Sequence, residues 1–140
     1  MPTSTDQLFV HLARHAEGQS DAVQRAIECI EAFTGRFNAR DLAGMDAMLH
    51  FPHAIISGGR LVVWDRPGQH SATFFDELEA TGWHHTTYRR QQAVLATPTK
   101  VHLLVEYSRD DAAGKPLSVH HNLWIVTFDD GRWGIKLRSH

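Results

Sequence analysis

The sequence lacks the features that would cross-link the chain, export it or attach it to nucleic acid. Its single cysteine, Cys29, cannot form a disulfide within the chain, and residues 1–4 show neither the basic start nor the apolar run of a secretory signal. The 14 Lys and Arg residues form no basic block and face 16 Asp and Glu residues, so the positive patch of a nucleic-acid-binding protein is missing. With 42% hydrophobic and 21% charged residues, the composition is that of a globular protein rather than a membrane-embedded one. We expect a cytoplasmic protein that binds neither nucleic acid nor membrane.

Histidine, in contrast, is abundant, with 11 residues in a chain of 140. Imidazole titrates near pH 6.5, so the net charge should rise steeply in mild acid. Three imidazoles from different strands could bind zinc. Adjacent histidines on a strand point to opposite faces, however, so a metal site would have to be assembled across several strands. We therefore predict no metal and no cofactor.

The hydrophobic periodicity changes from helical in the first half of the chain to strand-like in the second, which indicates a single α+β domain. Residues 1–19 are predicted to form a short helical arm, with Ser4 and Gln7 as a capping box, and residues 20–140 the main domain. A long helix should begin at Ser20 and run through Phe37. A shorter one should start after Asp41 and continue until Pro52 ends it.

Glycine and proline mark the next elements. Gly58 and Gly59 separate two short apolar runs, residues 54–57 and 60–64, and this spacing predicts a β-hairpin. Pro67 suits the first turn of a further helix and Gly82 suits its end.

From Trp83 to Arg138, turn signals at residues 97–99, 110–114 and 129–131 divide the sequence into four strand-like runs, which predicts an antiparallel meander. Residues 101–105 and 123–128 are apolar on both faces of their strands. We expect helices to cover one face and a partner subunit the other, so a homodimer is predicted.

This order of elements resembles the nuclear-transport-factor-2-like superfamily, and over about residues 20–140 the sequence is similar to its SnoaL-like members. The resemblance rests on these segments: Phe37-Asn38-Ala39-Arg40-Asp41, His50-Phe51-Pro52-His53, Gly82-Trp83-His84, Lys100-Val101-His102, Asp130-Gly131-Arg132-Trp133-Gly134-Ile135 and Arg138-Ser139. It implies a cone-shaped half-open barrel, in which a curved antiparallel sheet wraps N-terminal helices and the open end holds an apolar pocket.

The catalytic carboxylates of the superfamily are mostly missing from this sequence. Ketosteroid isomerase has a carboxylate base at a position that corresponds to residues 54–58, where this sequence has none. Limonene epoxide hydrolase needs two aspartates in its pocket. Most acidic residues of the predicted meander lie in turns instead, and Glu106 is the main exception. Scytalone dehydratase works without a cofactor through histidines, an aspartate, tyrosines and an asparagine. Among these enzymes, only its residue set has partial counterparts here, namely His84, Tyr88, His120 and Asn122.

Alternation along the strands then selects candidate pocket residues. His84, His120 and Tyr88 are the predicted catalytic residues, since imidazole can act as acid or base near neutral pH; the alternative is that the histidines are hydrogen-bonded packing residues. Arg138 either points into the cone to hold a substrate oxyanion or pairs with an acid at the rim. The predicted substrate-binding residues are Asn122, Arg138, Trp124, Trp83 and His53.

Two functions fit these candidates. The first is a cofactor-independent acid–base enzyme, of dehydratase, cyclase or isomerase type, acting on a small, mostly apolar oxygenated molecule in an enclosed pocket. The second is a non-catalytic module that binds a small ligand or assembles as a dimer, in which the same histidines serve packing and respond to pH.

Overall fold

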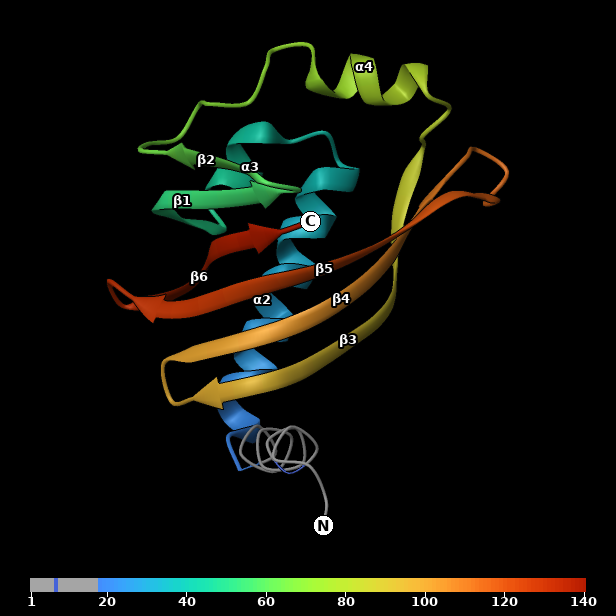
Figure 1. The fold of residues 1–140 in the computed structure, drawn as a ribbon. Helices are drawn as coiled ribbons and strands as arrows, with labels where there is room; N and C mark the ends of the chain where they lie inside the picture. Colours follow the sequence, from blue (N-terminus) through green and yellow to red (C-terminus); the bar gives the residue numbers. More distant parts are fainter. Residues whose placement is uncertain (1–6, 8–17) are drawn as a thin grey trace.

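The computed structural model describes Gln7 and residues 18–140, so the arm predicted for residues 1–19 lies almost entirely outside the described residues. The long helix α2 (Ser20–Asn38) begins where the sequence predicts it and runs along the concave side of a curved sheet (Figure 1). Its buried residues recur at intervals of three and four, as an amphipathic helix requires: Ala22, Ala26, Cys29, Ile30, Phe33 and Thr34.

The second helix is shorter than the sequence predicts. α3 (Leu42–Asp46) is capped by Asp41, whose Oδ1 accepts a hydrogen bond from the Gly44 amide at 2.9 Å. Strand β1 (Leu49–Ser57) then starts at Leu49, so the prediction of helix as far as Pro52 is wrong. The physical reason is strand pairing: Leu49 lies opposite Ile135, and the Ile135 amide donates to the Met48 carbonyl at 2.9 Å.

The sheet has six strands in the order β2-β1-β6-β5-β4-β3. β2 (Arg60–Trp64) forms the predicted hairpin with β1 across Gly58 and Gly59, and Gly58 adopts the positive φ of 59° that such a turn needs. β3 (His85–Thr97), β4 (Lys100–Asp110), β5 (Pro116–Asp129) and β6 (Arg132–Ser139) form the predicted antiparallel meander. β6 pairs in parallel with β1, so β2 and β3 are the two edges of an unclosed, cone-shaped sheet.

The segment between β2 and β3 differs from the prediction of a helix starting at Pro67. Only Phe74–Ala80 (α4) is helical, and residues 65–73 form an irregular segment. Gly68 in this segment has a φ of 87°, and its amide donates to Asp46 Oδ2 at 2.8 Å. The segment and α4 lie at one end of the cone, beyond β2 (Figure 1).

A register shift in β6 decides which of its side chains face the interior. Ile125 and Val126 of β5 lie opposite Leu137 and Ile135, so Lys136 is an extra residue between the two pairs. Strict alternation along the strand would place Arg138 and Ile135 on opposite faces, and the bulge interrupts that alternation. Both residues are buried instead.

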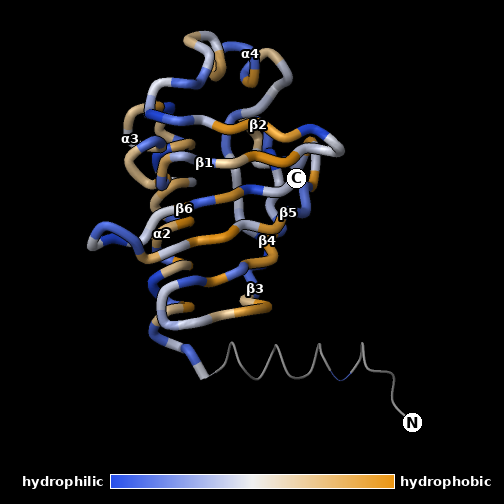
Figure 2. Tube along the Cα trace, turned by 60° about the vertical axis from the view of Figure 1, so that its left-hand side comes forward, coloured by the Kyte–Doolittle hydropathy of each residue, from blue (hydrophilic) through white to orange (hydrophobic). Residues whose placement is uncertain are grey.

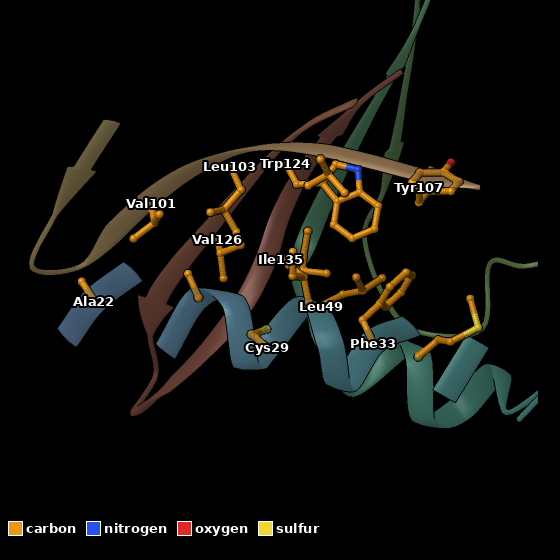
Figure 3. Packing of buried hydrophobic residues seen from close by; sticks show 14 of the residues in the cluster. Ala22, Cys29, Phe33, Leu49, Val101, Leu103, Tyr107, Trp124, Val126 and Ile135 are labelled. Carbon is orange, nitrogen blue, oxygen red and sulfur yellow. The ribbon is translucent and has the colours of Figure 1, made fainter. Parts of the chain in front are cut away.

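The core lies between α2 and the inner face of the sheet. Figure 3 shows Phe33 of α2 facing Trp124 of β5, with Leu103 and Val126 farther along the same layer. Phe33 and Trp124 pack edge to face, with ring centroids 5.7 Å apart. Hydrophobic and hydrophilic stretches alternate along the strands (Figure 2). The outer surface nonetheless retains large apolar side chains: Leu61, Val63, Leu104, Leu117, Val119 and Phe128.

We predict opposite effects for two glycine-to-alanine substitutions. A Cβ at Gly134 in β6 would lie 2.7 Å from His50 Cδ2, so Gly134→Ala should lower the free energy of unfolding by about 1–3 kcal/mol. A Cβ at Gly35, on the exposed side of α2, meets nothing within 4 Å, so Gly35→Ala should raise it by about 0.5–1 kcal/mol. Urea unfolding measures both, and an unchanged Gly134→Ala variant would show that His50 does not pack against this glycine.

Candidate functional site

A cavity of about 300 Å³ lies between α2, the inner face of the sheet and the segment between β2 and α4. Its wall is largely apolar, and no Asp or Glu side chain lines it among the described residues. Its lining residues are Phe33, Thr34, Phe37, Met45, Ile55, Trp64, Gln69, His70, Ser71, Phe74, Thr86, Tyr107, Arg109, Trp124, Arg138 and His140.

Arg138 places a positive charge in this apolar wall. The β6 bulge turns it inward opposite Trp124, and its guanidinium carbon lies 5.1 Å from the ring centroid of Phe33 and 5.9 Å from that of Trp64. Burial lowers its pKa to about 10, so the side chain remains a cation at neutral pH. No carboxylate pairs with it in the described part of the chain. The structure thus decides for the inward orientation of Arg138 rather than for a rim ion pair.

His53 fixes the orientation of this arginine. The fully buried His53 ring uses Nδ1 to donate to the Ile135 carbonyl at 3.0 Å, which leaves Nε2 as an acceptor for Arg138 Nε at 3.0 Å. Burial and the adjacent Arg138 charge lower the pKa of His53 to about 3, so the ring is neutral at physiological pH. Because Nε is the guanidinium atom engaged with His53, the two terminal nitrogens remain available for a ligand.

His70 faces the same cavity from the segment between β2 and α4. Its ring lies between Trp64 and Phe74, with centroid distances of 4.6 and 5.5 Å. Its Nδ1 is 3.4 Å from Asp46 Oδ1, and both side chains are buried. Burial lowers the pKa of His70, while the Asp46 carboxylate acts in the opposite direction. The result is a neutral imidazole with a carboxylate behind Nδ1 and its Nε2 unpaired among the described residues.

The predicted catalytic residues lie elsewhere. His84 precedes β3, is exposed and does not line the cavity; its backbone carbonyl accepts a hydrogen bond from Arg40. His120 lies on the predicted concave face but stacks on Tyr107, with centroids 5.0 Å apart, outside the lining set. The Tyr88 hydroxyl donates to the Ile30 carbonyl and accepts from Thr34, which ties β3 to α2, and burial raises its pKa.

The predicted binding residues divide between the cavity and the core. Trp124 and Arg138 line the cavity, and His53 lies behind Arg138. Asn122 is buried and donates to the Tyr107 hydroxyl at 3.2 Å, so it supports a lining residue. Trp83 lies in the core under the Arg40 guanidinium, where its indole nitrogen donates to Thr86 Oγ1. His84, His120 and Arg138 therefore do not converge on one cavity.

The sequence-based assignment missed His70 and Asp46. Asp46 lay within the predicted second helix, and His70 within a predicted helix starting at Pro67, so neither was expected at a pocket. The signal that could have found His70 is the cluster Pro67-Gly68, which is more typical of an irregular segment than of a helix start. The pairing of these two residues, 24 positions apart, follows only from the path of that segment.

Among residues 18–140 and Gln7, no three His, Cys, Asp or Glu side chains gather as a metal site would need. No described helix is both long and apolar enough to cross a bilayer.

Solved structures with the same architecture were found at low sequence identity. A nuclear-transport-factor-2-like protein with a cystatin-like fold from Novosphingobium aromaticivorans matches with a TM-score of 0.64 and 12% identity, over 85% of this chain and 80% of that one. The chain has the nuclear-transport-factor-2-like fold. No protein-family model and no curated protein match the sequence, so the closer SnoaL-like assignment stays a prediction.

Two other nuclear-transport-factor-2-like neighbours carry provisional enzyme assignments. One, from Shewanella frigidimarina, is provisionally described as a ketosteroid isomerase and matches with a TM-score of 0.58 and 16% identity, over 82% of this chain and 93% of that one. The other, from Novosphingobium aromaticivorans, is provisionally described as a scytalone dehydratase, with a TM-score of 0.54 and 13% identity over 88% and 85%. At these identities the structural similarity establishes the fold of this domain. Its chemistry has to be inferred from the residues that line the cavity.

We predict that His53 makes the stability of the domain depend on pH. The pKa of His53 is about 3 in the folded protein and about 6.5 in an unfolded chain, so below pH 6.5 only the unfolded state takes up this proton. Stability is therefore fully present above pH 6.5 and decreases towards pH 3, by up to about 1.4 kcal/mol per pH unit for this one group.

His53→Gln keeps a donor and an acceptor at this position but does not titrate. Urea unfolding between pH 7 and 4 should therefore show a shallower loss of stability in the variant than in the wild type. Slopes are compared rather than absolute values, because the substitution also changes packing. Equal slopes in the two proteins would contradict a neutral His53 in the folded state.

Proposed function

We propose that this domain is a cofactor-independent acid–base enzyme that acts on a small, mostly apolar molecule carrying a carbonyl group, by isomerisation, dehydration or cyclisation. The observation that supports the proposal is the presence of a neutral imidazole, His70, and a buried cation, Arg138, in the wall of one apolar cavity. The provisional assignments of the two enzyme-like neighbours are of the same broad class.

His70 supplies the base. We assign the ring proton to Nδ1, 3.4 Å from Asp46 Oδ1, so that Nε2 carries the lone pair that removes a proton from a carbon next to the substrate carbonyl. The Nδ1 to Oδ1 distance of 3.4 Å is long for a hydrogen bond, as is common for catalytic pairs without substrate. Asp46 then orients the ring and stabilises the imidazolium that forms, so it acts as a positioning residue.

Arg138 stabilises the charge that develops on the substrate. When the C–H bond breaks, its electron pair moves to the carbonyl oxygen and produces an enolate. The two terminal nitrogens of Arg138 can donate to that oxygen, and the rings of Phe33 and Trp64 keep water away from the contact. With an unsaturated ketone, the proton on His70 then returns to the far carbon of the conjugated enolate, which completes an isomerisation. With a β-hydroxy ketone, the enolate electron pair forms a C=C bond as hydroxide leaves, and the proton on His70 converts the hydroxide to water, which completes a dehydration.

The alternative is a binding or assembly module. Its support is the apolar outer surface, where Leu104 and Val119 are close to half exposed, which a second copy of the chain in a homodimer would cover. In that case the cavity would bind a small ligand without turnover, and the histidines would respond to pH. Retention of ligand binding without any proton transfer would favour this alternative.

We predict that His70→Gln abolishes proton transfer. The measurement is deuterium incorporation from heavy water into α-tetralone, at the carbon next to the carbonyl, followed by NMR; this readout needs no knowledge of the natural product. The wild type should exceed the solvent rate, and His70→Gln should lose about a hundredfold or more of the catalysed rate. His121→Gln, which changes an exposed histidine on the outer face of the sheet, should leave the rate unchanged.

An unchanged rate in His70→Gln together with a large loss in His84→Gln would overturn this assignment in favour of the sequence-based one. No catalysed exchange of α-tetralone in the wild type would reject the enzyme proposal.

The pH profile provides a separate test of the Asp46 contact. The base must be neutral, and burial places the pKa of His70 below 6.5, so the exchange rate should fall only as the pH drops below that value. The Asp46 carboxylate acts to raise this pKa, so in Asp46→Asn the fall should move to lower pH. A profile that keeps its midpoint in Asp46→Asn would show that Asp46 is structural only.

A further inference from the structure

The cavity has a second cation, Arg109, that the proposed chemistry does not use. Arg109 lies near the end of β4, opposite Ser118 of β5 and Thr86 of β3, and its side chain lines the same cavity as Arg138. Its Nε is buried and has no hydrogen-bond partner among the described residues. No acidic side chain forms an ion pair with it in the described part of the chain.

The residues around Arg109 offer hydrogen-bond donors rather than a balancing negative charge. Tyr107, two residues earlier on the same face of β4, accepts a hydrogen bond from Asn122, which leaves its own hydroxyl proton available to a ligand. Figure 3 shows Tyr107 at one end of the layer of core side chains, beyond Trp124. Tyr107 and Arg109 together can therefore bind an anionic oxygen group at this end.

Two histidines, His120 and His140, lie next to these residues. His120 stacks on Tyr107, and His140 lines the cavity with its backbone amide donating to the Ile56 carbonyl at 2.8 Å. Burial and nearby positive charges, including Arg109, lower the pKa of both rings. Both rings are thus neutral at physiological pH and add no further positive charge beside Arg109.

A cavity with two arginines and no acidic lining residue is matched by a ligand with two anionic oxygen groups. Arg138 is buried without a counter-ion in the described part of the chain, and the buried Nε of the half-buried Arg109 has no hydrogen-bond partner there. An anion that reaches each guanidinium would supply what these groups lack. Phe33, Phe37 and Trp124 also line the cavity, and their rings suit an apolar ring in the same ligand.

We propose, building on the proposed function, that the substrate is an apolar cyclic molecule with a second anionic oxygen group, a carboxylate or a phosphate, which Arg109 and Tyr107 bind while Arg138 holds the reacting oxygen. Arg109 is then the residue that selects doubly anionic substrates, and the proton transfer at His70 proceeds as described above. The distance between the Arg109 and Arg138 side chains sets the distance between the two anionic groups on the ligand.

Binding of simple aromatic acids tests this inference without any turnover. The probes are benzoate and three dicarboxylates of increasing length, namely isophthalate, terephthalate and naphthalene-2,6-dicarboxylate, with the fluorescence of the lining residues Trp64 and Trp124 as the signal. The wild type should bind at least one dicarboxylate about tenfold or more tightly than benzoate. 4-Carboxyphenyl phosphate binding more tightly than every dicarboxylate would identify the second group as a phosphate.

Arg109→Gln should remove the preference for two anions and leave benzoate binding at Arg138 within about twofold. Arg109→Lys keeps the positive charge and should keep part of the preference. This result would show that the loss in Arg109→Gln comes from the missing charge and not from a folding defect. Arg89→Gln, which changes an exposed arginine of β3, is the matched control and should behave as the wild type.

Equal affinities for benzoate and all doubly anionic probes in the wild type, or an undiminished preference in Arg109→Gln, would overturn the inference. Its failure is distinguishable from failure of the proposed function. Deuterium exchange in a wild type that shows no preference for two anions rejects only the role of Arg109, whereas a preference that Arg109→Gln removes, in a wild type without exchange, rejects only the acid–base chemistry.

Discussion

The hydrogen bond from Arg138 to His53 is the contact on which the chemistry of the cavity depends. A guanidinium buried among aromatic rings needs an acceptor, and here that acceptor is an uncharged imidazole held by the Ile135 carbonyl. A carboxylate in its place would neutralise the cation and occupy its terminal nitrogens. Because His53 is neutral and engages only Nε, the positive charge stays directed into the cavity, where a substrate oxyanion can use it.

The same cation explains how the domain can use the nuclear-transport-factor-2-like fold without a carboxylate in the cavity wall. Arg138 would lower the energy of a developing enolate, and the proposed base is an imidazole whose neighbouring carboxylate, Asp46, lies outside the lining set. Asp46 also accepts from the Gly68 amide, so one side chain holds both the segment that carries His70 and the His70 ring. Folding of that segment and assembly of the candidate base therefore depend on the same residue.

Much of the fold could be predicted because it follows from local patterns. The spacing of Ala26, Ile30 and Phe33 indicates the long helix, and Gly58-Gly59 indicates the hairpin. The errors arose where pairing overrode local preference. Leu49 fits a helix by its spacing, but it lies in β1 because Ile135 offers a parallel partner. In β6 the extra residue Lys136 breaks the strict alternation that would put Arg138 and Ile135 on opposite faces of the sheet. No sequence signal marks that bulge.

By itself, the sequence determined the order of elements, the helical core face, the meander and the presence of Arg138, His53 and Trp124 among the candidates. These depend on periodicity and turn residues, which act over a few positions. Only the tertiary structure decided which side chains meet. His70 and Asp46 come together because an irregular segment returns over the end of α3, whereas His84 is exposed just before β3 and does not line the cavity. Such pairings depend on the path of the whole chain, which local periodicity does not encode.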